Sequence, residues 1–203
     1  QTIPIIDSIF EQQLINLGYD VIHDGYVLTD SVSTIDTLII SGYPSFEIED
    51  LSGIEYFSNL QYLDCSNNNI DSLNLNQNTD LKHLNCFSNS IQTLIIDSLY
   101  ALTVLDCSFN VLTEINLLGN PGLTNLTCIR NELTALNLSN NTFLGNLNCG
   151  ENNITTLDLS MMDLYTLNCQ NNALNSINLT DNISLFWLIC YNNDLQEINL
   201  SDN

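Results

Sequence analysis

Residues 60–75 read LQYLDCSNNNIDSLNL, and the chain repeats this pattern almost to its last residue. The shared framework is L-x-x-L-x-C-x-x-N-x-L-x-x-L-x-L, with Ile in place of some of the leucines. Its cysteines follow one another at spacings of 21, 21, 21, 21, 20 and 21 residues, at Cys65, Cys86, Cys107, Cys128, Cys149, Cys169 and Cys190. A repeat this short cannot bury its own apolar face, so stacked copies must share one continuous core.

The two halves of the repeat predict different conformations. In the first half, residues two apart lie on one face of a strand, so the second leucine and the cysteine point inward together. Stacked copies of this half predict a curved parallel β-sheet on the concave face of a solenoid. The second half, L-x-x-L-x-L, predicts short extended or 3₁₀ segments on the convex face, because a repeat of 21 residues leaves little room for a helix.

These repeats resemble the short, cysteine-containing leucine-rich repeats of internalin-type bacterial surface proteins, over residues 60–200. The resemblance implies an α/β-type repeat solenoid of the leucine-rich repeat class. It also implies that the asparagine three residues after each cysteine forms a ladder inside the solenoid. These residues are Asn68, Asn89, Asn110, Asn131, Asn152, Asn172 and Asn193.

Outside the seven regular repeats the pattern weakens. A degenerate copy carries Ile40 where the cysteine would stand and has no ladder asparagine. Before it, Ser8 and Glu11 match a capping box, and helical apolar spacing up to Gly18 predicts a short helix from about Asp7 to Leu17. We therefore expect an N-terminal cap at residues 1–34, a degenerate first repeat at 35–59 and seven repeats at 60–203 with no C-terminal cap.

Charge and composition exclude several classes of function. The chain has 24 acidic residues against Lys82 and Arg130, a net charge of −22, so we expect no binding to nucleic acid. No apolar run is long enough to span a bilayer, and 44% apolar content argues against disorder. The chain starts at Gln1 without a signal peptide, which we interpret as removal of that peptide from a secreted or outer-surface protein.

Metal, cofactor and catalytic sites find little support. The cysteines show no Cys-x₂-Cys spacing and point inward, so we expect free, buried thiols rather than a zinc site. Calcium-binding motifs are absent, although calcium on the acidic surface is left open. His83 points outward and Cys86 inward, so they cannot form a nucleophile–base pair. We expect no cofactor and no enzymatic activity.

The outward positions of the strands are the remaining candidates for a functional site, because their side chains do not pack in the core. Most hold small polar residues, but two groups depart from this and predict a partner-binding surface. The first group is Tyr62, His83, Phe87, Val104, Phe109 and Ile129, with Arg130 alongside; the second is Phe186, Trp187, Ile189 and Tyr191. Asp64 and Asp106 belong to the same predicted partner-binding surface as charges that steer the partner toward it.

In the first group, Phe87, Phe109 and Ile129 are expected to form a stripe across consecutive repeats. The predicted function is recognition of a protein partner with a basic patch, since acidic charge speeds its approach. The resemblance implies adhesion or capture of a host protein, such as a serum or complement component. A glycan-binding module and a structural spacer remain the alternatives.

Overall fold

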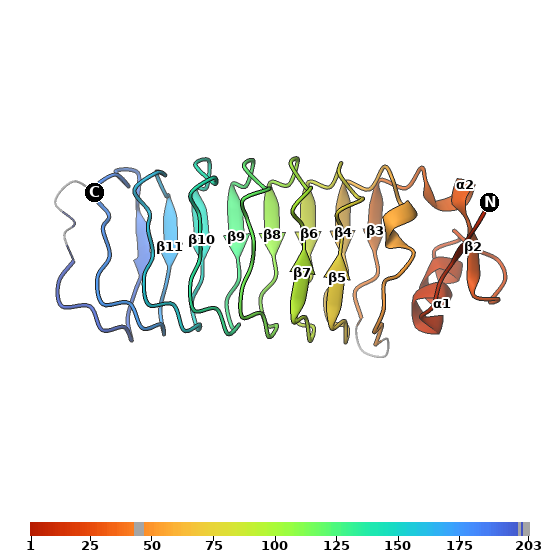
Figure 1. Cartoon of the computed structure of the whole chain (residues 1–203), viewed down its shortest axis with the longest axis horizontal. Helices are drawn as coiled ribbons and strands as arrows, with labels where there is room; N and C mark the ends of the chain where they lie inside the picture. The colour runs from red at the N-terminus through yellow and green to blue at the C-terminus, as the bar shows by residue number, and fades with distance from the viewer. Residues whose placement is uncertain (43–46, 199, 201–203) are drawn as a thin grey trace.

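A computed structural model describes residues 1–42, 47–198 and 200 of the chain. Its main feature is an eight-stranded parallel sheet with one strand from each repeat, stacked along the long axis of the molecule (Figure 1). Neighbouring strands pair in register, so equivalent residues of successive repeats lie side by side. The strands are β3 (Thr37–Ile39), β4 (Tyr62–Asp64), β6 (His83–Asn85), β8 (Val104–Asp106), β9 (Asn125–Thr127), β10 (Asn146–Asn148), β11 (Thr166–Asn168) and β12 (Trp187–Ile189).

The second half of the repeat forms a short strand or a 3₁₀ helix in the first copies and has no regular secondary structure in the later described ones. Two copies form a further parallel pair, β5 (Ser72–Asn74) and β7 (Thr93–Ile95), and the degenerate repeat has a 3₁₀ helix, η1 (Ile54–Tyr56). In the described chain after η1 there is no helix. The prediction of a leucine-rich repeat solenoid is therefore confirmed.

Leucines and cysteines fill the interior between these two layers. Leu63 and Cys65, which the strand alternation directs inward, are both fully buried, and the same holds in the next five repeats. All seven cysteines are free thiols, but Cys190 is only half-buried. The expectation that all seven thiols are buried is wrong at Cys190, because no strand of the described chain covers the outer side of β12.

The asparagine ladder is confirmed and its hydrogen bonds explain its regularity. Asn131 donates from Nδ2 to the carbonyl oxygens of Cys107 and Cys128, and its Oδ1 accepts from the N–H of Leu112. One side chain thus satisfies backbone groups in two adjacent repeats, at the bend where the chain leaves the strand. The other six ladder asparagines repeat this arrangement.

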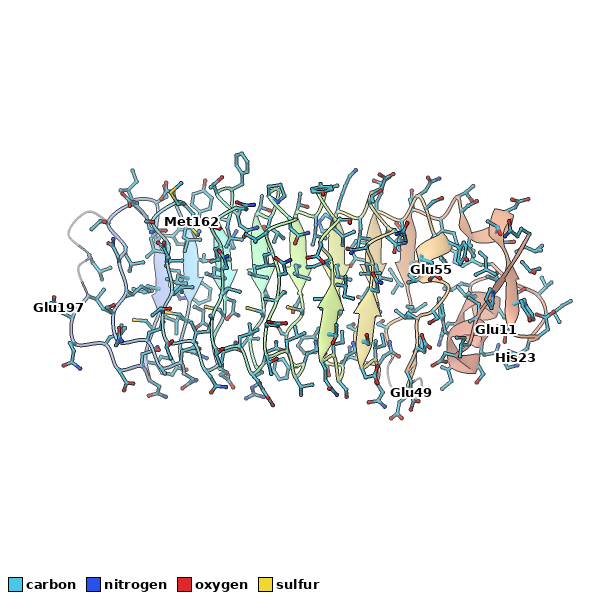
Figure 2. All side chains as sticks on the ribbon, in the orientation of Figure 1. Glu11, His23, Glu49, Glu55, Met162 and Glu197 are labelled. Atoms are coloured by element: carbon cyan, nitrogen blue, oxygen red, sulfur yellow. The ribbon has the colours of Figure 1, made fainter. Side chains whose placement is uncertain are left out.

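A second row of buried asparagines lies on the opposite edge of the solenoid and was not predicted. Asn78, Asn120, Asn141 and Asn182 are fully buried and donate to carbonyl oxygens of the preceding repeat. Leu99 interrupts the row, and buried Met162 interrupts it where the cysteine spacing falls to 20 residues (Figure 2). These interruptions hide the period in the sequence.

The residues before β3 fold against the first repeat. Strand β1 (Thr2–Pro4) pairs antiparallel with β2 (Tyr26–Leu28), and helices α1 (Ser8–Asn16) and α2 (Thr29–Val32) flank them. Phe10 of α1 stacks on Phe57 of the degenerate repeat, with ring centroids 6.4 Å apart. Helix α1 therefore covers the apolar end of the solenoid.

The predicted capping box is wrong, because Asp7 is the N-cap. Its Oδ1 accepts from the N–H groups of Ile9 and Phe10, and its Oδ2 accepts from those of Glu49 and Asp50. A carboxylate that caps the helix and also holds the next repeat is a stronger acceptor than a serine hydroxyl.

Glu11 has another role in the same cap. It is buried, accepts from the N–H groups of Asp24 and Gly25, and lies 3.1 Å from Nε2 of His23 (Figure 2). Because its carboxylate is engaged by this loop, Glu11 is not available to complete the predicted capping box.

Candidate functional site

The outward face of the eight-stranded sheet, here called the sheet face, carries the predicted site residues. On β4 and β6, Tyr62 and His83 pair in register and stack with ring centroids 5.8 Å apart. Val104 continues this row on β8 and is half-buried. The order of strands therefore brings these three residues of the first group together.

A second set of contacts lies just beyond the C-terminal ends of β6, β8 and β9. The rings of Phe87 and Phe109 lie with centroids 4.9 Å apart, and the guanidinium carbon of Arg130 lies 4.8 Å from the centre of the Phe109 ring. Arg130 also pairs with Glu151, so its positive charge is already neutralised. We call Tyr62, His83, Phe87, Phe109 and Arg130 the aromatic cluster.

The predicted stripe of Phe87, Phe109 and Ile129 needs correction in detail. Phe87 and Ile129 stand one residue after their cysteines, but Phe109 stands two residues after Cys107. The equivalent of Phe87 in that repeat is Ser108, which is buried. The stripe therefore zigzags, and the ring of Phe109 reaches Phe87 from the following turn.

The backbone at Phe109 is unusual. The residue two after each cysteine has a positive φ, between 52° and 57°, at Asn67, Ser88, Phe109, Arg130, Glu151, Asn171 and Asn192. Asparagine adopts this left-handed conformation readily, whereas a bulky side chain adopts it at a cost. Asparagine at three of the seven copies was the sequence signal for this turn.

Asp64 and Asp106, predicted as steering charges, also shape the backbone. Oδ1 of Asp64 accepts from the N–H of Ser66, and Oδ1 of Asp106 accepts from the N–H of Ser108. Asn85 makes the same contact to Phe87. An asparagine at either aspartate position would therefore keep the turn and lose only the charge.

The second predicted group lies apart from the first. Trp187 and Tyr191 are exposed and Ile189 is half-buried, all at or just after β12. Strands β9, β10 and β11 separate β12 from β8, so the two groups form separate patches on one face.

The thiols do not form a reactive site. Burial raises the pKa of every cysteine, to about 12 at Cys169, with nearby aspartates adding to the effect at Cys65 and Cys107. A protonated thiol is a poor nucleophile and a poor metal ligand. Among the residues that the structure describes, no group of three or more His, Cys, Asp and Glu side chains could hold a metal ion. The described helices include none that is long and apolar enough to cross a membrane.

Solved structures with the same architecture are numerous. The functional domain of InlJ from Listeria monocytogenes, which includes a cysteine ladder, is 28% identical with a TM-score of 0.59, over 100% of this chain and 55% of that one. The LRR protein LIC12759 of Leptospira interrogans is 25% identical with a TM-score of 0.73, over 80% of this chain and 44% of that one. Internalin C2 of Listeria monocytogenes has a TM-score of 0.77 at 21% identity, over 100% of this chain and 95% of that one, which shows the fold alone.

The chain is a cysteine-containing leucine-rich repeat solenoid. This leucine-rich repeat protein spans about half the length of the solved InlJ domain and of the solved Leptospira chain. No protein-family model matches the chain, and no curated protein does. The resemblance read from residues 60–200 is thus confirmed at the level of fold and repeat type.

Proposed function

We propose that this leucine-rich repeat protein is a non-enzymatic recognition module that binds a protein partner through the aromatic cluster on its sheet face. The observation that carries the proposal is Phe109, an exposed aromatic ring held on a left-handed residue. The turn would form more easily with asparagine, as other repeats show, so the fold does not require phenylalanine there. Exposed aromatic residues that the fold does not need are typical anchors of protein interfaces.

The charge around the cluster supports a partner with a basic patch. Asp64 and Asp106 flank Asn85 in register on adjacent strands, next to Phe87. Arg130 contributes no free positive charge, because Glu151 pairs with it. The chain carries a net charge of −22, which raises the encounter rate with a cationic surface.

The proposal extends to a secreted or outer-surface location and to a host protein such as a serum or complement component. The resemblance of the cysteine-containing repeats to those of bacterial surface proteins supports this part. Another protein of this fold was solved with a partner bound. It is the LRR ectodomain of the Arabidopsis receptor kinase GASSHO1/SCHENGEN3, in complex with CASPARIAN STRIP INTEGRITY FACTOR 2. That structure has a TM-score of 0.74 at 22% identity, over 83% of this chain and 22% of that one.

A capture experiment with matched variants tests the proposal. The immobilised protein is incubated with serum, the captured protein is identified, and its affinity is then measured directly with purified components. Phe87→Ala should weaken binding by at least about 1–2 kcal/mol, as expected of an interface anchor. Phe143→Ala is the control, since Phe143 is 72% exposed in the turn before β10. Equal affinity of wild type and Phe87→Ala, or loss of binding only in Phe143→Ala, contradicts the proposal.

A further inference from the structure

The part of the sheet face between the two aromatic groups has its own chemistry. The outward residues of β9, β10 and β11 are all uncharged, in a chain that carries 24 acidic side chains. They are Asn125, Thr127, Asn146, Asn148, Thr166 and Asn168. We call the four asparagines among them the amide patch.

The side-chain oxygens of the amide patch are fixed by contacts within the protein. Oδ1 of Asn146 accepts from Oγ1 of Thr166 at 2.9 Å. Oδ1 of Asn125 lies 2.9 Å from Oγ1 of Thr124, whose single proton also has the carbonyl oxygen of Thr103 within reach at 3.1 Å. Backbone N–H groups donate to Oδ1 of Asn148 and of Asn168. Contacts within the protein therefore orient the amides before any ligand arrives, most firmly at Asn146 and Asn168.

The nitrogens of the same four amides are unused. Within the described chain, none of their Nδ2 groups donates a hydrogen bond to the protein. Because the strands are in register, with a spacing of about 4.8 Å, the patch presents a regular array of donors to solvent.

Aromatic side chains border this array at β12. Trp187 pairs in register with Thr166 and is 59% exposed, and Phe186 is 77% exposed. Tyr165 lies against Gly145, since a Cβ there would come within 2.9 Å of its Cδ2, and it is 52% exposed. A partly exposed aromatic ring can stack on an apolar face of a ligand.

We infer that the amide patch and Trp187 form a binding site for a neutral oligosaccharide, separate from the protein-binding aromatic cluster. Sugar hydroxyl oxygens accept hydrogen bonds from preorganised amide donors, and the C–H faces of a pyranose ring stack on tryptophan. The net charge of −22 disfavours sulfated or sialylated glycans. A patch of small polar side chains lacks the anchors that a protein interface needs, which favours a saccharide.

The chain supplies its own reporter for the test, because Trp187 is its one tryptophan. The whole protein is titrated with mannopentaose, cellopentaose, chitopentaose and laminaripentaose while the emission of Trp187 is recorded, with heparin as the anionic comparison. At least one neutral pentasaccharide should shift the emission saturably, and heparin should not. No shift with any of the four, or a shift with heparin alone, overturns the inference.

Matched variants locate the site. Asn168→Asp removes a donor but keeps the turn, as Asp106 does at the equivalent position, and should weaken saccharide binding at least about tenfold. Asn85→Asp adds the same charge in the same row beside the aromatic cluster and should leave saccharide binding unchanged. Equal weakening by both variants would show a general charge effect and overturn the inference. So would loss of protein capture in Asn168→Asp without any saccharide binding, which would assign the patch to the protein interface.

Discussion

Phe109 shows at the scale of one residue how the fold and the site compete. Its left-handed backbone costs about 1–2 kcal/mol, while its ring gains about 0.5–1.5 kcal/mol from Phe87 and about 0.5–1 kcal/mol from Arg130. These terms nearly cancel. We therefore expect Phe109→Asn to change the free energy of unfolding by less than about 1 kcal/mol in urea denaturation, while it weakens partner binding. A loss above about 2 kcal/mol would show that Phe109 supports the fold instead.

The cysteines are predicted to act as small apolar residues. Cys128 is fully buried among leucines, so Cys128→Ser places a hydroxyl in an apolar core and should lower the free energy of unfolding by about 1–3 kcal/mol. Cys190→Ser is the matched control, because the half-buried Cys190 leaves the new hydroxyl within reach of water. Equal losses in the two variants would contradict the argument from burial.

At the scale of one element, the asparagine ladder holds each strand exit to its neighbours. Asn131→Ala leaves the buried N–H of Leu112 without its acceptor. It also takes one of two donors from each of the Cys107 and Cys128 carbonyl oxygens, which Asn110 and Asn152 still reach. One unsatisfied buried group costs about 1–3 kcal/mol, so we expect a loss in that range in urea denaturation. Asn153→Ala, at an exposed position, should cost almost nothing. A small effect of Asn131→Ala would show that water replaces the amide.

The N-terminal helix provides a sharper contrast between two adjacent residues. Asp7 accepts four backbone hydrogen bonds, two from α1 and two from the degenerate repeat, whereas no hydrogen bond of the Ser8 side chain caps the helix. Asp7→Ala should therefore lower the midpoint of thermal unfolding and cost about 2 kcal/mol or more. Ser8→Ala should change stability by less than about 0.5 kcal/mol. The reverse order would restore the capping box that the sequence pattern indicates.

The sequence predicted those features that recur in every repeat. The cysteines and the ladder asparagines repeat without exception from Cys65 to Asn193, and the leucine positions always hold Leu or Ile, so their roles follow from period and strand alternation. The second asparagine row could not be predicted, because Leu99 and Met162 interrupt it.

Features that depend on contacts between distant segments were also beyond the pattern. The choice of Asp7 as N-cap depends on Glu49 and Asp50, which are more than forty residues away. The outward aromatic residues were found by strand alternation, but the contact of Phe87 with Phe109 depends on the left-handed turn. The unused nitrogen donors of the amide patch could be recognised only from the hydrogen bonds that each side chain makes in the structure.

At the scale of the whole molecule, the sheet face divides according to charge. The strands β4, β6 and β8 carry aromatic side chains together with Asp64 and Asp106. The strands β9 to β12 carry the neutral amides together with Trp187. Because the strands follow one another in register in a single sheet, the two halves lie side by side on the same face. Outward positions carry this variation freely, since the core depends only on the inward ones.

The stacked thiols also give the whole molecule a pH dependence. Burial raises the pKa of the thiols from Cys65 to Cys169 above their ordinary value of 9.0, to about 12 at Cys169. The folded chain therefore keeps protons that the unfolded chain releases, so this stability is fully present below pH 9 and is lost as pH rises toward 12. Each buried thiol should lower the free energy of unfolding by up to about 1.4 kcal/mol per pH unit in that range.

Urea denaturation between pH 8 and pH 11 checks this dependence. We expect a steep fall above pH 9, the ordinary pKa of the thiol, and a shallower fall in Cys107→Ala, which lacks one buried thiol. Cys190→Ala is the control, because Cys190 is only half-buried and should contribute little to the slope. A free energy of unfolding that stays level up to pH 11, or an equal change of slope in both variants, would mean that the buried thiols do not set the alkaline limit of the solenoid.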